Sequence, residues 1–83
     1  MTEIVLVTSF ACHLCNDARA ALGELSREFP IEVREVDIAS AEGRVIVERF
    51  GPPIQPTVLV DGMLFSFGRL PRKKLRRRLA QAA

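Results

Sequence analysis

The sequence predicts an α/β fold in which a four-stranded mixed sheet carries helices on both faces, in the order βαβαββα. An apolar run rich in β-branched residues opens the chain, an amphipathic helical pattern follows it, and Asp61-Gly62 separates two later apolar runs. A strand joined to the next by a helix is expected to run parallel to it through a right-handed crossover. The last two strands are expected to form an antiparallel hairpin.

The first half of the chain predicts a strand, a helix and a second strand. Residues 2–8 form a nearly continuous apolar run, which is typical of a strand buried on both faces. Apolar residues then recur at three- and four-residue spacing, which predicts a helix of about four turns that Pro30 ends. They are Leu14, Ala18, Ala21, Leu22, Leu25 and Phe29. Residues 31–38 alternate in one phase at Ile31 and Val33 and in the other at Val36 and Ile38. This change of phase predicts a strand with a bulge.

A second, shorter helix is predicted to begin after Ser40, which is a suitable N-cap. Its core-facing residues are expected to be Val45, Ile46 and Phe50. Gly51 suits the position after the helix, and the two prolines that follow it prevent continuation.

The second half of the chain predicts a hairpin and a terminal helix. Asp61-Gly62 lies between the apolar runs 57–60 and 63–67, and a type I′ turn requires positive φ at both of its central residues. Pro71 suits the first turn of the last helix. Leu75 and Leu79 would share the face of that helix that packs on the core, with the basic residues mostly outside.

Length and composition favour one folded domain covering residues 1–83, with about half of the residues apolar. No apolar run approaches the roughly 18 residues that a membrane span requires. The first residues lack the pattern of a signal peptide, so we expect a cytoplasmic protein that does not bind membranes. In that compartment a CxxC motif is more often catalytic or metal-binding than structural.

Cys12 and Cys15 are the candidate catalytic residues. Cys12 lies where the first predicted strand gives way to the first helix, so free amide N–H groups and the positive end of the helix dipole favour its thiolate and lower its pKa. The thiolate is the attacking species in disulfide exchange. We therefore assign Cys12 as the nucleophile and Cys15, three residues on, as the thiol that resolves a mixed disulfide.

Two neighbours of the cysteines are candidate substrate contacts. A cationic His13 would support the thiolate, but a cation is disfavoured at a helix N-terminus, so we expect a largely neutral His13 that tunes Cys12. An exposed residue without a role is the alternative. Phe10 would be either a contact surface beside Cys12 or a residue packed into the core.

The motif Cys12-His13-Leu14-Cys15, the proline at position 56, the Asp61-Gly62 hairpin and the order βαβαββα together resemble a glutaredoxin-like protein of the thioredoxin superfamily. The resemblance extends from Glu3 to about Leu79. It implies a thioredoxin-like, glutaredoxin-type fold and disulfide oxidoreductase activity through the redox-active pair Cys12 and Cys15, with no other cofactor.

The resemblance also assigns a role to Pro56, which matches the cis-proline that faces the cysteines in the superfamily. The residue before that proline, here Gln55, offers its backbone N–H and C=O to the substrate in the manner of an added strand. A trans proline in a proline-rich loop is the alternative. The implied partners are a disulfide-containing protein substrate and a reductant, either thioredoxin reductase or a low-molecular-weight thiol such as glutathione. We expect the protein to act as a monomer.

The chain departs from glutathione-using glutaredoxins at several positions. Ser9 replaces a basic residue, His13 replaces a proline, and Ile54-Gln55 replaces Thr-Val. Gly68, followed by Arg69, stands where those proteins carry two glycines and an acid, so Gly68 is a candidate contact for a small thiol and Arg69 a candidate partner for its carboxylate. The segment 65–71 resembles the tail of redoxins that take electrons from thioredoxin reductase.

Two other functions remain open. Small copper chaperones also place CxxC after their first strand, and soft thiolates suit Cu(I), but those domains end on a strand and lack a proline placed like Pro56. Residues 69–83 carry seven Lys or Arg and no acid, whereas residues 1–68 carry five Arg and ten acids. The basic terminal helix would therefore attract an acidic redox partner, or else form a solvated face; we do not expect nucleic acid to be its partner.

Overall fold

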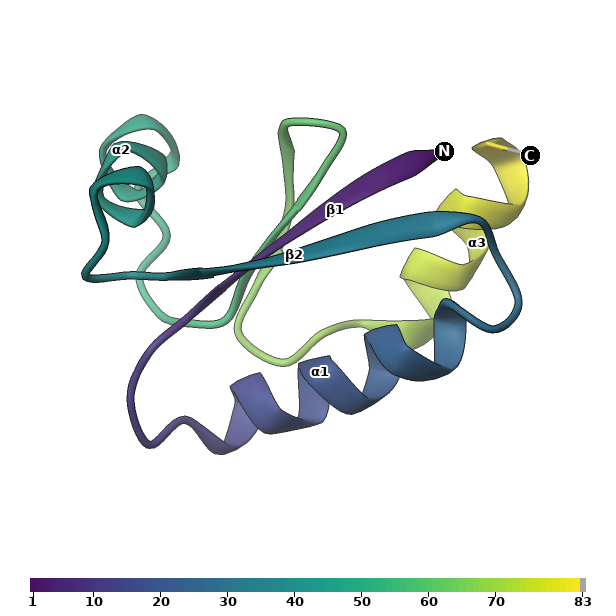
Figure 1. Ribbon diagram of the computed structural model, residues 1–83, viewed down its shortest axis with the longest axis horizontal. Helices are drawn as coiled ribbons and strands as arrows, with labels where there is room; N and C mark the ends of the chain where they lie inside the picture. Colours follow the sequence, from purple (N-terminus) through teal and green to yellow (C-terminus); the bar gives the residue numbers. More distant parts are fainter. Residues whose placement is uncertain (83) are drawn as a thin grey trace.

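The computed structural model describes residues 1–82 and has the predicted order of elements (Figure 1). The strands are β1 (Thr2–Thr8), β2 (Ile31–Asp37), β3 (Thr57–Val60) and β4 (Met63–Phe67), and the helices are α1 (His13–Leu25), α2 (Ala41–Phe50) and α3 (Arg72–Ala82). The strands form one sheet in the order β2-β1-β3-β4. β1 pairs with β2 in parallel and with β3 antiparallel, and β3 and β4 form the antiparallel hairpin, so the mixed sheet is confirmed.

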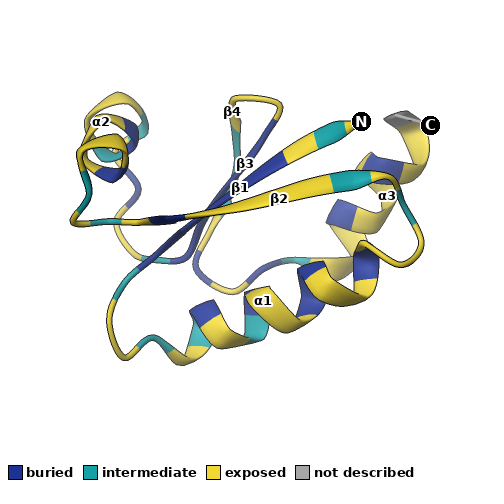
Figure 2. Ribbon diagram, viewed as in Figure 1, coloured by how far each residue is buried: buried dark blue, intermediate teal, exposed yellow. Residues whose placement is uncertain are grey.

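Alternate side chains of the sheet enter two separate cores, one on each face. Ile4 and Leu6 of β1 and Val58 and Val60 of β3 pack with α1 and α3. Val5, Val7 and Leu59 face the other way and pack with Ile46 of α2. Figure 2 shows the buried side of α1 turned toward the sheet and its outer side exposed. The two central strands are therefore buried on both faces, in β1 from Ile4 to Thr8, which confirms the prediction for that part of residues 2–8.

The bulge predicted in the second strand is wrong. β2 pairs with β1 in unbroken register from Ile31 opposite Thr2 to Asp37 opposite Thr8. The change of phase instead reflects the two cores, because Ile31 packs against the α1 and α3 side and Val36 against the α2 side. The register irregularity of the sheet lies in the hairpin, between Val58 and Leu59 of β3.

The first helix ends earlier than predicted. Its α-helical part stops at Leu25, and residues 26–29 continue as a turn. The Ser26 hydroxyl donates to the Gly23 carbonyl at 2.7 Å, and Pro30 disfavours a helical conformation for Phe29. Phe29 still packs against the core from this turn.

Helix α2 begins and ends as predicted but is rotated relative to the predicted face. The Ser40 hydroxyl accepts a hydrogen bond from the Gly43 N–H at 3.0 Å, and Gly51 ends the helix in the left-handed conformation. Ile46 is buried and Phe50 packs at the edge of the core. Val45, predicted to face the core, is 61% exposed.

The hairpin turn and the start of α3 place the last two strands and the terminal helix. Asp61 and Gly62 have φ of 48° and 83°, as a type I′ turn requires. Pro71 directly precedes α3 and its carbonyl accepts from the Leu75 N–H at 3.0 Å. Leu75 and Leu79 are buried, as predicted. Within residues 1–82, none of the helices combines the length and the apolar character that crossing a membrane requires.

Candidate redox site

Cys12 caps the N-terminus of α1. The chain leaves β1 at Thr8, passes through Ala11 with φ of 53°, and reaches Cys12 in an extended conformation. The Cys12 Sγ accepts a hydrogen bond from the Cys15 N–H at 3.0 Å. A cysteine sulfur thus takes the place that a Ser or Asp oxygen usually occupies at an N-cap, where free N–H groups stabilise negative charge.

The two cysteines form a disulfide across the first turn of α1, with their Cα atoms 5.1 Å apart. Their exposure differs. Cys12 is partly exposed, whereas the exposed fraction of Cys15 is 0%. Of the two cysteines, only Cys12 is therefore open to solvent.

The bond between Gln55 and Pro56 is cis, as predicted, and Pro56 is buried beside the disulfide. The Gln55 carbonyl oxygen lies 4.0 Å from the Cys12 Sγ. The Thr57 hydroxyl donates to Gln55 Oε1 at 2.9 Å. The residue before the cis-proline thus has a fixed side chain, and its backbone lies within reach of any group bound to Cys12.

Gly68 joins this segment from the end of β4. Its N–H donates to the Pro56 carbonyl at 2.9 Å. Its φ of 78° lies in the left-handed region that favours glycine, and a Cβ at this position would lie 3.1 Å from Ile54 Cδ1. The structure therefore brings Gln55, Pro56 and Gly68 together near Cys12. Gly68 is buried and holds Pro56 through its backbone hydrogen bond.

Phe10 and His13 lie on the open side of the site. The exposed fraction of Phe10 is 98%, so the alternative in which it packs into the core is wrong. His13 is the first residue of α1 and is exposed. An apolar ring and an imidazole thus flank Cys12 on its solvent side.

A polar hollow of about 320 Å³ opens beside Cys12 and Phe10, lined by the connection from β1 to α1, by α1 and by β2. Glu35 is its central group. Arg19 donates to both Glu35 oxygens, at 2.6 and 2.9 Å, and the Thr8 hydroxyl donates at 3.4 Å. The hydrogen bond from Arg19 holds the pKa of the Glu35 carboxyl below its usual value, with a smaller contribution from Thr8. The hollow is lined by Thr8, Ser9, Phe10, Ala11, Cys12, Asn16, Arg19, Glu35 and Asp37.

The sequence analysis missed this hollow. One signal was available, because the carboxyl ends of the parallel strands β1 and β2 meet at the same edge of the sheet, which is the edge where Cys12 lies. Glu35 is near that end of β2, and Arg19 is one helical turn beyond Cys15. The ion pair that joins them could not be anticipated without the register of the two strands.

Comparison with known protein families shows to which family the chain belongs. The model of the family described as "Glutaredoxin-like domain (DUF836)" matches residues 3–80. The chain belongs to this glutaredoxin-like family. Curated protein sequences include no significant match to this glutaredoxin-like chain.

Solved structures confirm the thioredoxin fold of this glutaredoxin-like chain. Mitochondrial thioredoxin 3 from Saccharomyces cerevisiae, in its oxidised form, matches with a TM-score of 0.71 and 18% identity over 96% of this chain and 77% of that one. Thioredoxin O2 from Arabidopsis thaliana, also oxidised, matches with a TM-score of 0.72 and 18% identity over 98% and 74%. A point-mutant thioredoxin from Halobacterium salinarum gives a TM-score of 0.72 and 15% identity over 96% and 73%.

Proposed function

We propose that the protein is a dithiol oxidoreductase that reduces disulfides in protein substrates. The observation that carries the proposal is the unequal burial of two cysteines joined across the first turn of a helix, with the partly exposed Cys12 at the N-cap and the buried Cys15 behind it. Membership of the glutaredoxin-like family and the CxxC pair support thiol–disulfide redox chemistry.

The proposed reaction has two exchange steps. The Cys12 thiolate attacks one sulfur of the substrate disulfide, which forms a mixed disulfide with Cys12 and releases the other substrate sulfur as a thiolate that takes up a proton. The Cys15 thiolate then attacks the Cys12 Sγ, and the second substrate thiolate leaves. Two electrons have passed to the substrate, and the Cys12–Cys15 disulfide seen in the structure remains.

Substrate binding is proposed for the residues around Cys12. The Gln55 carbonyl, 4.0 Å from the Cys12 Sγ, would accept a hydrogen bond from the substrate backbone beside the reacting cysteine. Pro56 and Gly68 hold that backbone in place through the hydrogen bond between them. Phe10 and His13 would contact substrate residues on the solvent side. We propose a monomer acting in the cytoplasm.

The electron donor is proposed to be thioredoxin reductase or a low-molecular-weight thiol. The purified protein is mixed with a disulfide-bonded peptide, and NADPH oxidation is followed with glutathione and glutathione reductase in one assay and thioredoxin reductase in another. We expect turnover with one donor, abolished by Cys12→Ser. Absence of Cys12-dependent turnover with both donors would contradict the proposal.

A measurement of Cu(I) binding beside the turnover assay tests the metal-carrier alternative. In residues 1–82, no three or more His, Cys, Asp and Glu side chains are grouped so as to hold a metal ion. Two thiolates alone can bind Cu(I), so Cys12 and Cys15 remain sufficient for that function. Tight Cu(I) binding by the reduced protein, together with no turnover, would favour the carrier.

A further inference from the structure

The cations of α3 fall into two groups. The members of the first group pair with acidic residues of α1 and of the turn that follows it. Arg72 donates to Asp17 at 2.9 Å and to Glu24 at 3.3 Å. Arg76 forms an ion pair with Glu28. These contacts join α3 to α1 and to the turn that follows it, on the same face of the sheet, so Arg72 and Arg76 have a structural explanation.

The cations of the second group form no ion pair that would explain them structurally. It comprises Lys73, Lys74, Arg77 and Arg78, which we call the basic row. All four side chains are exposed, and in the part of the chain that the structure describes none has a carboxylate within ion-pair distance. Lys74 lies over the ring of Phe65, with its Nζ 5.4 Å from the ring centre, but that contact leaves its charge unpaired.

The spacing of the basic row works against the helix. Lys73 and Arg77, and likewise Lys74 and Arg78, are four residues apart, which places like charges next to each other on the helix surface. Such pairs destabilise a helix by about 0.2–0.5 kcal/mol each. A local arrangement that opposes folding, with no compensating ion pair in the described structure, is typical of a functional surface.

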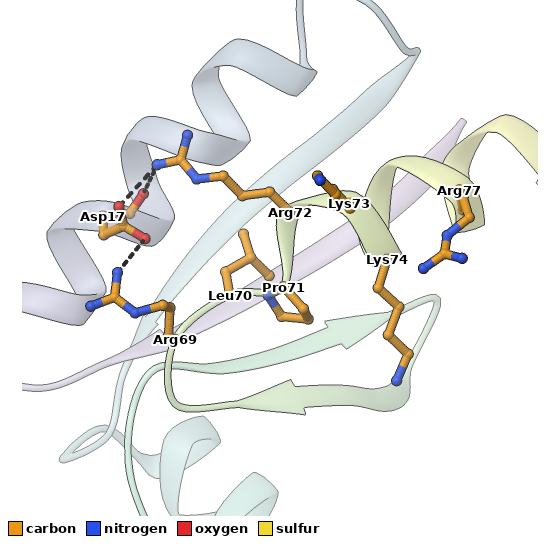
Figure 3. Close-up of a pocket in the computed structure, with 8 residues that line it drawn as sticks. All are labelled: Asp17, Arg69, Leu70, Pro71, Arg72, Lys73, Lys74 and Arg77. Atoms are coloured by element: carbon orange, nitrogen blue, oxygen red, sulfur yellow. Dashed lines mark hydrogen bonds and ion pairs between the residues drawn. The ribbon is translucent and has the colours of Figure 1, made fainter.

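The basic row borders a shallow hollow of about 530 Å³ between α1 and the start of α3. Figure 3 shows Arg69 and Arg72 reaching toward Asp17, while Lys74 and Arg77 point away from it. Five cationic side chains and a single carboxylate line this hollow. Its residues are Asp17, Arg69, Leu70, Pro71, Arg72, Lys73, Lys74 and Arg77.

The hollow is connected to Cys12 by short steps. The Gln55 carbonyl is 4.0 Å from the Cys12 Sγ, and Gly68, which bonds to Pro56, directly precedes Arg69. With standard backbone dimensions for the covalent steps between these contacts, the Cα of Arg69 lies within about 18 Å of the Cys12 Sγ. Helix α3, which carries the basic row, begins at Arg72 and runs away from the N-terminal end of α1 (Figure 1).

We propose that the basic row is the docking surface for an acidic face of the protein whose disulfide Cys12 reduces. The inference rests on the proposed function and names the kind of partner. A protein interface of standard size covers about 800 Å² on each partner, a patch about 30 Å across. The longest dimension of this chain is 32 Å, so a folded partner whose disulfide reaches Cys12 is large enough to extend to α3.

Charge complementarity selects the partner. Only an acidic surface would relieve the repulsion within the basic row when it docks, and it would also accelerate the encounter. Nucleic acid is also anionic, but it carries no disulfide. The proposed partner must both dock on the basic row and present a disulfide to Cys12.

The test uses three synthetic peptides that share one disulfide loop and differ in a flexible tail of six residues ending in four Glu, four Gln or four Lys. Such a tail spans about 20 Å when extended, which carries it past Arg69 toward the basic row. The rate constant kcat/KM for reduction is measured from low to physiological salt. We expect the Glu peptide to be reduced about tenfold faster than the Gln peptide at low salt, with the difference shrinking as salt screens the charges.

Variants then locate the effect. Lys73→Glu with Arg77→Glu should remove the preference for the Glu peptide and leave the rate with the Gln peptide unchanged. Arg44→Glu with Arg49→Glu makes the same change in net charge on α2, across the sheet, and should keep the preference. Lys73→Gln with Arg77→Gln, which should reduce the preference by less, covers the case in which the double Glu variant does not fold.

The outcomes separate the inference from the proposed function. Reduction of all three peptides at equal rates, dependent on Cys12, would overturn the docking surface and leave the oxidoreductase intact. Reduction of none would overturn both. Binding of a fluorescent DNA duplex that depends on Lys73 and Arg77, without any preference for the Glu peptide, would assign the basic row to nucleic acid and also overturn the proposal.

Discussion

Gly68 connects the hairpin to the redox site, and its replacement by Ala has an effect that can be worked out in advance. A residue with a Cβ in the left-handed region at φ of 78° is less stable by roughly 1–2 kcal/mol. The new Cβ would lie 3.1 Å from Ile54 Cδ1, so Ile54, which is 52% exposed, must shift by a few tenths of an ångström. We expect Gly68→Ala to lose about 1–2 kcal/mol of unfolding free energy, or about 5–15 °C in Tm for a domain of this size.

The chain offers a matched control for the backbone contribution. Gly51 has φ of 59°, and nothing lies within 4 Å of a Cβ placed there. Gly51→Ala should therefore lose a similar stability through the backbone alone. Only Gly68→Ala should also slow reduction of a disulfide peptide, because Ile54 precedes Gln55, whose carbonyl lies beside Cys12.

The assays are thermal unfolding of the oxidised protein by circular dichroism and the initial rate of peptide reduction at saturating donor. If both variants reduce the peptide at the same rate, the segment that contains Ile54 does not position substrate. An unchanged Tm for Gly68→Ala would refute the argument from backbone conformation.

Two further predictions concern stability. Gly43→Ala should destabilise the protein by about 1–3 kcal/mol in urea unfolding, because its Cβ would clash with the Asp37 carbonyl. Gly23→Ala, at a helical site with nothing within 4 Å of a Cβ, should instead stabilise the protein by about 0.5–1 kcal/mol. A Gly43→Ala variant as stable as the wild type would refute the close contact. The hydrogen bond from Arg19 lowers the pKa of Glu35 in the folded protein, so its contribution to stability is present above the ordinary carboxyl pKa and lost as the pH falls through the folded value. The difference in unfolding free energy between the wild type and Glu35→Gln should therefore be full at neutral pH and shrink in acid, and a difference independent of pH would contradict this.

Much of the fold could be predicted because each local signal agrees with the global arrangement. The Asp61-Gly62 turn, the Ser40 cap and the Gly51 end depend on a few neighbouring residues and on backbone preferences that act locally. The two-sided burial of Ile4 to Thr8 follows from their composition alone. These features are confirmed.

The errors arise where tertiary contacts decide. Val45 and Ile46 are adjacent apolar residues on α2, and the sequence does not say which of them faces the sheet. The close approach of Gly43 to the Asp37 carbonyl sets the rotation of the helix and leaves Val45 exposed. In the same way, the change of phase in β2 reflects two different cores rather than a bulge, and the pattern of apolar residues cannot distinguish the two.

The site was predicted only in part, because some of its residues belong to local motifs and others are brought together only by tertiary contacts. Cys12, Cys15 and Pro56 carry recognisable spacing, and the cis bond and the position of the disulfide are confirmed. The Glu35 and Arg19 pair beside Cys12 spans 16 residues and depends on the parallel register of two strands. Neither residue belongs to a local motif, so only the folded chain reveals them.

The roles of the two cysteines are tested most directly by trapping the mixed disulfide. Cys15→Ser and Cys12→Ser are each reduced, mixed with the disulfide peptide and analysed by intact-protein mass spectrometry. Because Cys12 is accessible and Cys15 is buried, Cys15→Ser should accumulate one peptide covalently attached at Cys12, and Cys12→Ser should form no adduct on the same timescale. An adduct on Cys15 in the Cys12→Ser variant, formed as fast as the adduct on Cys12, would contradict the assignment of Cys12 as the nucleophile.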